Sequence, residues 1–132
     1  MRLVYFGELG RMFLRRLRIS FKGIKKYSGT ADQICVQILL DCFESKQEYF
    51  RTSAGHFCEF YCRDLGWSVE SLVKLGYKKE VVSTLSYSLN IFERHGRVDQ
   101  TINPSGIPFT FPNVYSPDAL ATAVQALFTT SP

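Results

Sequence analysis

Two stretches with the hydrophobic spacing of helices follow each other with almost no connecting segment. The first begins at Asp64 and has an apolar face of Leu65, Val69, Leu72 and Val73. The second continues to His95-Gly96 with apolar residues at Val81, Val82, Leu85, Leu89 and Phe92. Gly76 stands where a glycine commonly ends a helix, and the short connection through Gly76 and Tyr77 favours antiparallel neighbours. The sequence therefore predicts an α-hairpin in the middle of the chain.

Further helices are predicted on both sides of this hairpin. Thr30 and Gln33 form a Thr-x-x-Gln capping box that opens a helix. The apolar face of this helix consists of Ile34, Ile38, Leu39, Cys42 and Phe43. Ser116 is a suitable N-cap and Pro117 a suitable first residue for a last helix. Its apolar face consists of Leu120, Ala123, Val124, Leu127 and Phe128. Together with a helix at the N-terminus, these segments place the chain in the all-α class, built from antiparallel α-hairpins.

Two segments lack helical spacing and are predicted as loops. Residues 47–56 lose the hydrophobic pattern and end in small residues. Residues 97–115 begin with an extended stretch, have the sequence of a turn at 103–106, and contain prolines that prevent a regular helix. A long irregular segment inside a compact domain is usually functional.

The first 26 residues are strongly basic. They contain eight lysines or arginines against Glu8 alone, a net charge of +7, whereas the rest of the chain carries −3. An apolar stripe of Phe13, Leu17, Phe21 and Ile24 is surrounded by basic residues at Arg11, Arg15, Arg16, Arg18, Lys22 and Lys25. This pattern favours a packing helix with a solvated basic face, and it leaves open a surface for an anionic partner. We expect this helix over residues 1–28 and one helical domain over 29–132.

The cysteine spacing argues against a structural zinc site. Cys-x-x-Cys pairs are absent from the set Cys35, Cys42, Cys58 and Cys62. No signal-peptide pattern is present, and no apolar run approaches the ~20 residues needed to span a bilayer. We therefore expect a cytoplasmic protein without a transmembrane segment, metal or cofactor, whose cysteines are reduced and mostly buried.

Arg63 and Asp64 stand side by side where the first helix of the hairpin begins, with Tyr61 and Trp67 close by in sequence. Taken alone, Asp64 is a suitable N-cap and Arg63 a solvated charge. The same residue types also suit a sugar, because hydroxyls need paired donors and acceptors while pyranose faces stack on aromatic rings. Either an N-cap or a substrate-binding clamp fits the pattern.

A longer block around this pair resembles part of a known glycosidase domain. The block comprises "YFRTSAGHFCEFYCRDLGWSVESLVKLGY" and "INPSGIPFTFPNVYSPDAL". It is similar to the N-terminal part of six-hairpin (α/α)6 glycosidases of the glucoamylase and glycogen-debranching type. The resemblance implies an incomplete segment of an (α/α)6 barrel and a carbohydrate substrate. It also implies that Arg63 and Asp64 match a pair that binds hydroxyls of the sugar to be cleaved, with Tyr61 and Trp67 as neighbours.

The resemblance also implies that much of such a barrel is missing. Twelve helices of ~11 residues with their connections need more than ~150 residues, whereas this sequence predicts five helices. The catalytic carboxylates of these glycosidases come from later parts of the barrel, so we assign no catalytic residue here. Glu59, Asp99 and Asp118 are expected in solvated or capping roles.

The sequence thus predicts a fragment or short homologue of a glycoside hydrolase acting on α-glucosidic bonds, which contributes a sugar-binding Arg-Asp clamp. A second chain would be the partner that completes the barrel, and whether the chain is itself an enzyme stays open. The alternative is a small helical binding module whose basic N-terminal helix engages nucleic acid or an anionic surface, with nucleic acid the less expected of the two. A non-functional remnant fits the same residues.

Overall fold

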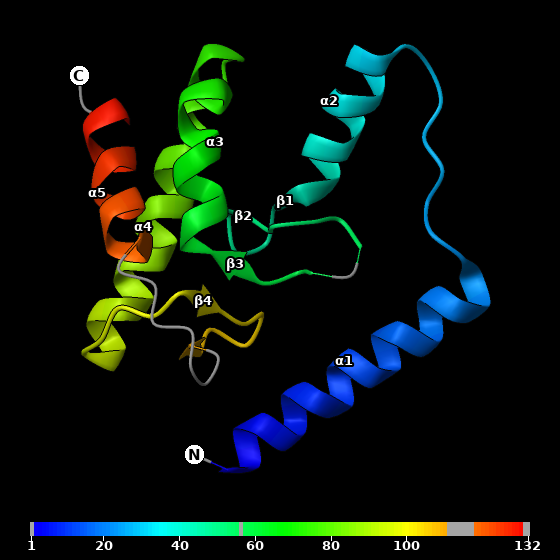
Figure 1. Cartoon of the computed structure of the whole chain (residues 1–132), viewed down its shortest axis with the longest axis horizontal. Coiled ribbons are helices and arrows are strands. Elements are labelled where there is room, and N and C mark those ends of the chain that lie inside the picture. Colours follow the sequence, from blue (N-terminus) through cyan, green and yellow to red (C-terminus); the bar gives the residue numbers. More distant parts are fainter. Residues whose placement is uncertain (1, 56, 111–117, 131–132) are drawn as a thin grey trace.

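The computed structural model describes residues 2–55, 57–110 and 118–130, which are mostly helical (Figure 1). The helices are α1 (Arg2–Lys22), α2 (Ala31–Cys42), α3 (Cys62–Lys74), α4 (Lys78–His95) and α5 (Asp118–Thr130). The strands are β1 (Phe43–Glu44), β2 (Tyr49–Phe50), β3 (Phe60–Tyr61), β4 (Thr101–Ile102) and β5 (Pro108–Phe109). The predicted number of helices is confirmed for the described residues. The all-α class needs correction, because two small antiparallel sheets join the helices.

Strands β2, β4 and β5 lie in the segments predicted as loops, whereas β3 lies outside both, and β1 includes Phe43, which was predicted to belong to the apolar face of a helix. Strand β1 pairs with β2, and the second sheet has the order β3-β4-β5. Each strand is two residues long, too short to show the alternating pattern by which strands are recognised in a sequence. The turn at 103–106 is confirmed, since the backbone N–H of Gly106 donates to the carbonyl of Asn103 at 2.9 Å. This turn connects β4 to β5.

The predicted α-hairpin is confirmed, with α3 and α4 running in opposite directions (Figure 1). Gly76 has a φ of +92°, and the next residue, Tyr77, donates its N–H to the carbonyl of Leu72 at 2.9 Å. Such a left-handed residue after a helix is best supplied by glycine. The buried residues of α4 differ in part from the prediction: they are Val81, Thr84, Leu85, Ser88, Ile91 and Phe92. Val82 and Leu89, predicted to face the core, are exposed.

Helix α5 packs closely against α3 and presents an unexpected face to it. Of the α5 side chains described, Thr122, Ala126 and Thr130 are buried, whereas Val124 and Phe128 from the predicted apolar face are exposed. A Cβ added to Gly66 of α3 would overlap the side chain of Thr122. The absence of a side chain at Gly66 therefore allows the two helices to approach. The predicted N-cap Ser116 and the following Pro117 lie outside the described residues.

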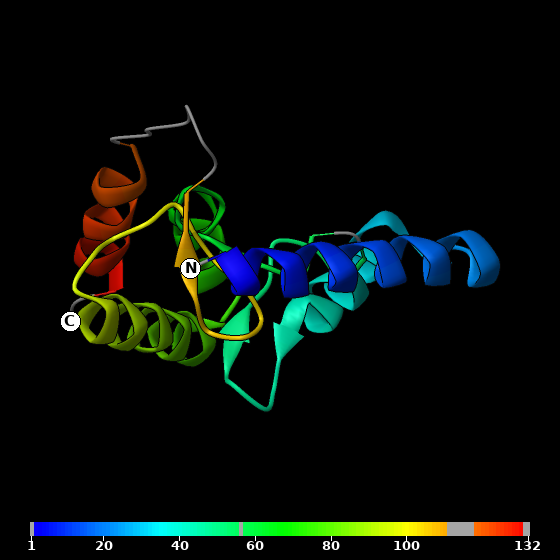
Figure 2. The same cartoon turned by 90° about the horizontal axis from the view of Figure 1, so that it is seen from below.

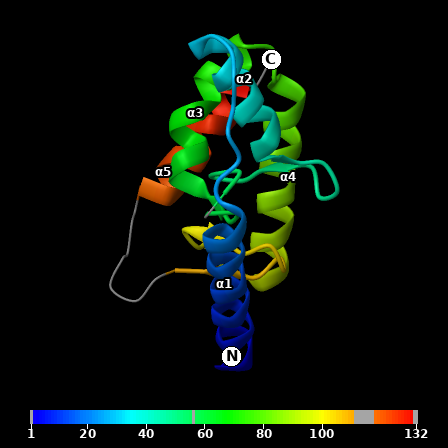
Figure 3. The ribbon, with the colours of Figure 1, turned by 90° about the vertical axis from the view of Figure 1, so that its right-hand side faces the viewer.

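Helices α1 and α2 contribute little to the core. The predicted capping box of α2 is confirmed by a bond from the Gln33 N–H to Thr30 Oγ1 at 3.4 Å and one from the Thr30 N–H to Gln33 Oε1 at 3.0 Å. None of the α2 residues is fully buried. The C-terminal half of α1 projects beyond the rest of the chain (Figures 1 and 2), and its N-terminal end extends past the lower end of α4 (Figure 3). The expected packing of the α1 apolar stripe is wrong, because Phe13 is 61% and Phe21 86% exposed.

The cysteines carry free thiols but are less buried than predicted. Cys62 is buried, Cys42 and Cys58 are partly exposed, and Cys35 is exposed. Across the described ranges, no three His, Cys, Asp or Glu side chains are grouped so that they could hold a metal ion. A bilayer-spanning helix, of sufficient length and apolar character, is not found among the helices that the structure describes.

The core contains a pair of tyrosines that predicts a loss of stability at alkaline pH. The rings of Tyr49 and Tyr87 stack in parallel with their centroids 4.3 Å apart. Burial raises the pKa of Tyr87 to about 12 and raises that of Tyr49 as well. In the unfolded chain both ionise near pH ~10, so the folded state retains these protons longer. The contribution of the two protonated tyrosines to the free energy of unfolding is complete below pH ~10 and is lost as the pH rises towards ~12.

We expect the free energy of unfolding, measured with urea, to decrease between about pH 10 and about pH 12. The Tyr87→Phe variant is the matched control. The hydroxyl of Tyr87 is buried without a hydrogen-bond partner, so its removal should leave stability at neutral pH nearly unchanged while flattening the alkaline decline. An equally steep decline in this variant would contradict the assignment to Tyr87.

Candidate ligand-binding pocket

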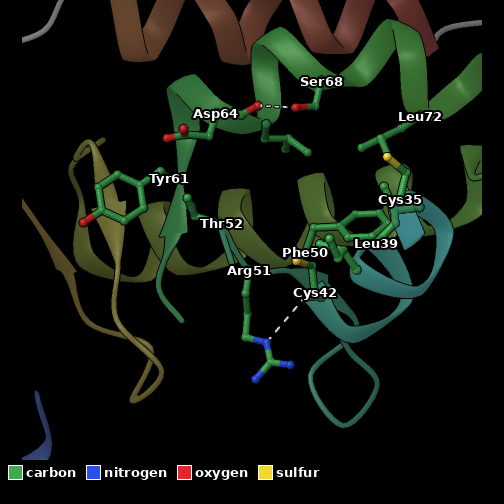
Figure 4. A pocket seen from close by; sticks show the side chains of 12 residues that line it. Cys35, Leu39, Cys42, Phe50, Arg51, Thr52, Tyr61, Asp64, Ser68 and Leu72 are labelled. Atoms are coloured by element: carbon green, nitrogen blue, oxygen red, sulfur yellow. Dashed lines mark hydrogen bonds between the residues drawn. The ribbon is translucent and has the colours of Figure 1, made fainter. Parts of the chain in front are cut away.

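A pocket of about 260 Å³ lies between α2, the segment of β2 and α3 (Figure 4). It is lined by Cys35, Ile38, Leu39, Cys42, Phe50, Arg51, Thr52, Tyr61, Asp64, Leu65, Ser68 and Leu72. These residues come from three separate parts of the sequence, residues 35–42, 50–52 and 61–72. The pocket therefore depends on the docking of α2 and the β1-β2 hairpin beside α3.

One part of the pocket wall is polar. Ser68 lies one turn after Asp64 on α3, and its hydroxyl donates to the backbone carbonyl of Asp64 at 2.8 Å (Figure 4). The Asp64 carboxylate itself has no hydrogen bond to any described residue. Thr52 donates its backbone N–H to the carbonyl of Glu59 at 3.0 Å, but its buried Oγ1 has no hydrogen-bond partner among the described residues. A buried hydroxyl without a partner is uncommon in a folded protein, and a ligand can satisfy it.

Apart from Arg51, the rest of the wall is mainly apolar and uncharged. The side chains of Leu39, Phe50 and Leu72 lie across the pocket from Asp64 (Figure 4). The thiols of Cys35 and Cys42 lie beside them. Burial raises the pKa of the Cys42 thiol, which keeps it neutral near pH 7. Burial likewise raises the pKa of Tyr61, so its hydroxyl stays protonated and can donate a hydrogen bond. The pocket therefore offers one carboxylate and several hydroxyls beside an apolar surface.

Arg51 belongs to the framework of the pocket. Its Nη2 donates to the carbonyl of Asp41 at 2.6 Å, and its Nη1 lies 3.7 Å from the carboxylate of Glu44. These contacts connect β2 to the end of α2 and to β1. The guanidinium thus stabilises the wall of the pocket.

The structure divides the four residues of the predicted clamp into two pairs. Tyr61 and Asp64 line the pocket, whereas the guanidinium carbon of Arg63 lies 5.2 Å from the centre of the Trp67 ring. This distance is typical of a cation–π contact. Consecutive residues of a helix point ~100° apart, which explains why Arg63 and Asp64 do not share one surface. Trp67 is 71% exposed, so its ring forms an accessible aromatic face beside the pocket.

The N-cap interpretation of Asp64 is wrong. Helix α3 begins at Cys62, its N-cap is Tyr61, and no side chain caps it. Asp64 therefore lies inside the first turn, where a carboxylate is favourable because of the helix dipole. Its side chain is free to contribute to the pocket.

The other acidic residues considered from the sequence do not line this pocket. Glu59 is only 4% exposed and pairs with Arg15 and Arg11, so the expected solvated or capping role is wrong for it. Asp99 accepts a hydrogen bond from the hydroxyl of Thr110 at 2.9 Å and pairs with Arg97 at 2.8 Å. The side chain of Asp118 is outside the described part of the structure.

Thr52 and Ser68 are pocket residues that the sequence interpretation missed. Ser68 follows Asp64 by four residues, and this spacing on a helix was a usable signal. Thr52 had no such signal, because it reaches the pocket through the pairing of β1 with β2.

Comparisons with known proteins identify no relative: no family model matches the chain, and neither the curated proteins nor the solved structures contain a significant match.

Proposed function

We propose that the chain binds a carbohydrate without cleaving it, with one sugar ring in the pocket beside Asp64. The observation that carries this proposal is the free carboxylate of Asp64 next to the unpartnered hydroxyl of Thr52. A sugar hydroxyl can donate to the carboxylate while a second hydroxyl bonds to Thr52. The apolar face of the sugar ring would contact Tyr61 and Leu65. The volume is below the ~300 to 1,000 Å³ of pockets for larger ligands, which suits a single ring.

A longer oligosaccharide would extend from the pocket to Trp67. On a regular helix Trp67 lies about 60° around the axis from Asp64, which makes it the next surface along α3. Arg63 lies over the Trp67 ring and adds a donor for hydroxyls there. In this arrangement all four predicted residues contact sugar, but they act as two neighbouring subsites.

The absence of a carboxylate pair at the pocket supports binding without hydrolysis. Among the described residues that line it, Asp64 alone carries a carboxylate. Glycosidic bond cleavage generally requires two, separated by ~5 to 9.5 Å depending on the stereochemical outcome. We therefore propose a fragment or short homologue of a six-hairpin glycosidase, with α-glucans as the ligand class and a second chain as the partner that would supply catalysis. The cytoplasmic location expected from the sequence stays a prediction.

The Asp64→Asn variant tests the pocket directly. A hydrogen bond to a charged group contributes roughly 1.5 to 3 kcal/mol, so this variant should bind maltose ~10- to 150-fold more weakly than the natural chain. Trp67→Ala should instead leave maltose binding nearly unchanged and weaken maltopentaose by about 3- to 10-fold, because only the longer ligand reaches the indole. Isothermal titration calorimetry gives these dissociation constants, and an assay for released glucose should show no turnover.

Glu70→Gln is the matched control, since Glu70 is an exposed carboxylate of the same helix that pairs with Lys74 at 2.5 Å. This variant should bind both sugars as the natural chain does. No binding of either sugar by the natural chain, or equal binding by the Asp64→Asn variant, would overturn the proposal. Release of glucose would overturn its non-catalytic part.

A further inference from the structure

Helix α1 turns its polar side towards the rest of the chain. Its partly buried residues are Glu8, Arg11, Met12, Arg15 and Ile19, which follow one helical face. The guanidinium of Arg15 lies 3.3 Å from the Glu59 carboxylate, and that of Arg11 lies 3.5 Å from it. The hydroxyl of Ser105 donates to Glu8 at 3.4 Å. The helix is therefore attached through ion pairs and hydrogen bonds, in contrast to the apolar packing of α3, α4 and α5.

The opposite side of α1 is apolar and unpartnered. The exposed large hydrophobic residues of this helix are Phe6, Leu9, Phe13, Leu14, Leu17 and Phe21. On a regular helix they fall within an arc of about 140°. The arc is centred on the side away from Arg15, so the body of the chain cannot cover it. Ile24, just after the helix, is also exposed.

Basic residues border this apolar arc on both edges. Arg16 lies at one edge and Arg18 at the other, whereas Lys22 lies about 40° further from the arc, close to the direction of Arg15. All three are exposed. Within the first 26 residues the one acidic side chain is Glu8, and it faces the body. Long basic side chains beside an apolar helical face can keep their charges at the surface while the apolar residues are buried.

We propose that α1 lies in the plane of an anionic lipid surface, with its aromatic and aliphatic arc at the boundary between headgroups and acyl chains. Arg16 and Arg18 would then lie beside lipid phosphates and carboxylates. The ion pairs of Arg11 and Arg15 with Glu59 would hold the rest of the chain on the aqueous side. This proposal concerns a surface separate from the sugar pocket and does not depend on it.

The composition of the exposed side favours lipid over two other occupants. A nucleic acid would be bound through the basic residues and would leave the phenylalanines in water. A second copy of α1 would cover the apolar arc but would bring the bordering arginines of both copies together, at an electrostatic cost. An anionic bilayer can bury the apolar arc among its acyl chains and pair the basic side chains with its negatively charged headgroups.

Co-sedimentation with vesicles tests this inference. The full chain should bind vesicles of phosphatidylcholine mixed with phosphatidylserine and should bind pure phosphatidylcholine much more weakly. The Arg16→Gln/Arg18→Gln variant should bind the mixed vesicles about 30-fold more weakly, since each basic residue contributes about fivefold. The Phe13→Ser/Phe21→Ser variant should lose binding while retaining its helical circular dichroism. Lys78→Gln/Lys79→Gln on α4 is the control with the same charge change, and it should bind as the natural chain does.

Four outcomes would overturn the inference. Equal binding to both kinds of vesicle would exclude recognition of anionic lipid. Full vesicle binding by the Phe13→Ser/Phe21→Ser variant would exclude burial of the apolar arc. If the natural chain bound duplex DNA and no vesicles, and if the Phe13→Ser/Phe21→Ser variant still bound the DNA, the helix would be assigned to nucleic acid. Sedimentation of the lipid-free chain as a dimer that Phe13→Ser/Phe21→Ser dissociates would assign the arc to a second copy.

Discussion

Replacing Gly66 by alanine should lower the midpoint of thermal unfolding by about 4 to 12 °C. The new Cβ would overlap Thr122 Cβ and would lie 2.9 Å from its Cγ2 and 3.0 Å from its Cα. Because the Cα belongs to the backbone of α5, a change of rotamer at Thr122 cannot relieve the overlap. Overpacking of this kind costs roughly 1 to 3 kcal/mol. Differential scanning calorimetry of the two chains measures the difference.

Gly10→Ala is the matched control for this prediction. Gly10 lies inside α1, and a Cβ there would meet nothing within 4 Å. Alanine is the better helix former, so this variant should be as stable as the natural chain or slightly more stable. In the Gly66→Ala background, the second substitution Thr122→Gly should restore part of the lost midpoint of thermal unfolding, because it removes the Cβ that the new alanine side chain overlaps. An unchanged midpoint for Gly66→Ala would show that α5 does not pack on α3 at this distance.

Replacing Glu59 by alanine should release α1 from the rest of the chain. Glu59 is the shared acceptor of Arg11 and Arg15, and its carboxylate is almost completely buried. Removing one member of a buried ion pair leaves an uncompensated charge and costs about 3 kcal/mol or more. This corresponds to a ~150-fold larger population of detached α1. Limited proteolysis in the connection at residues 23–30 should then be faster by up to that factor.

Glu70→Ala serves as the control, because the exposed pair of Glu70 with Lys74 on α3 contributes only about 0.3 to 0.5 kcal/mol. Its cleavage rate in the connection should match that of the natural chain. A double-mutant cycle with Arg15→Ala separates the coupling between Arg15 and Glu59 from the separate effects of each substitution. Unchanged proteolysis in Glu59→Ala would show that α1 is held by other contacts.

Part of the candidate site could be predicted because it lies in one continuous segment. Tyr61 and Asp64 were identified from their position at the start of α3, and both line the pocket. The paired action of Arg63 and Asp64 was not predictable from their adjacency, since neighbours on a helix point in different directions. On the α2 side, Ile38, Leu39 and Cys42 of the predicted apolar face line the pocket, but the sequence does not show that this face lies opposite α3.

Several helix ends and the turn between β4 and β5 were determined by the sequence itself, although the start of α3 was not. The capping box at Thr30, the glycines at 76 and 96 and the turn after Asn103 all act through backbone conformation and hydrogen bonds within a few residues. Such interactions do not depend on distant parts of the chain. The antiparallel course of α3 and α4 followed from the shortness of their connection.

Only the tertiary structure decided which side of each helix is buried. Thr84 and Ser88 of α4 enter the core because their hydroxyls donate to the carbonyls of Glu80 and Leu85 within the same helix, which removes the cost of burying a polar group. Val82 is exposed, because none of the described segments covers its side of α4. In α1 the attachment of Arg15 to Glu59 turns the apolar arc outward, against the hydrophobic pattern. The pattern shows that a helix has an apolar side, whereas the shapes and charges of distant segments determine which side they contact.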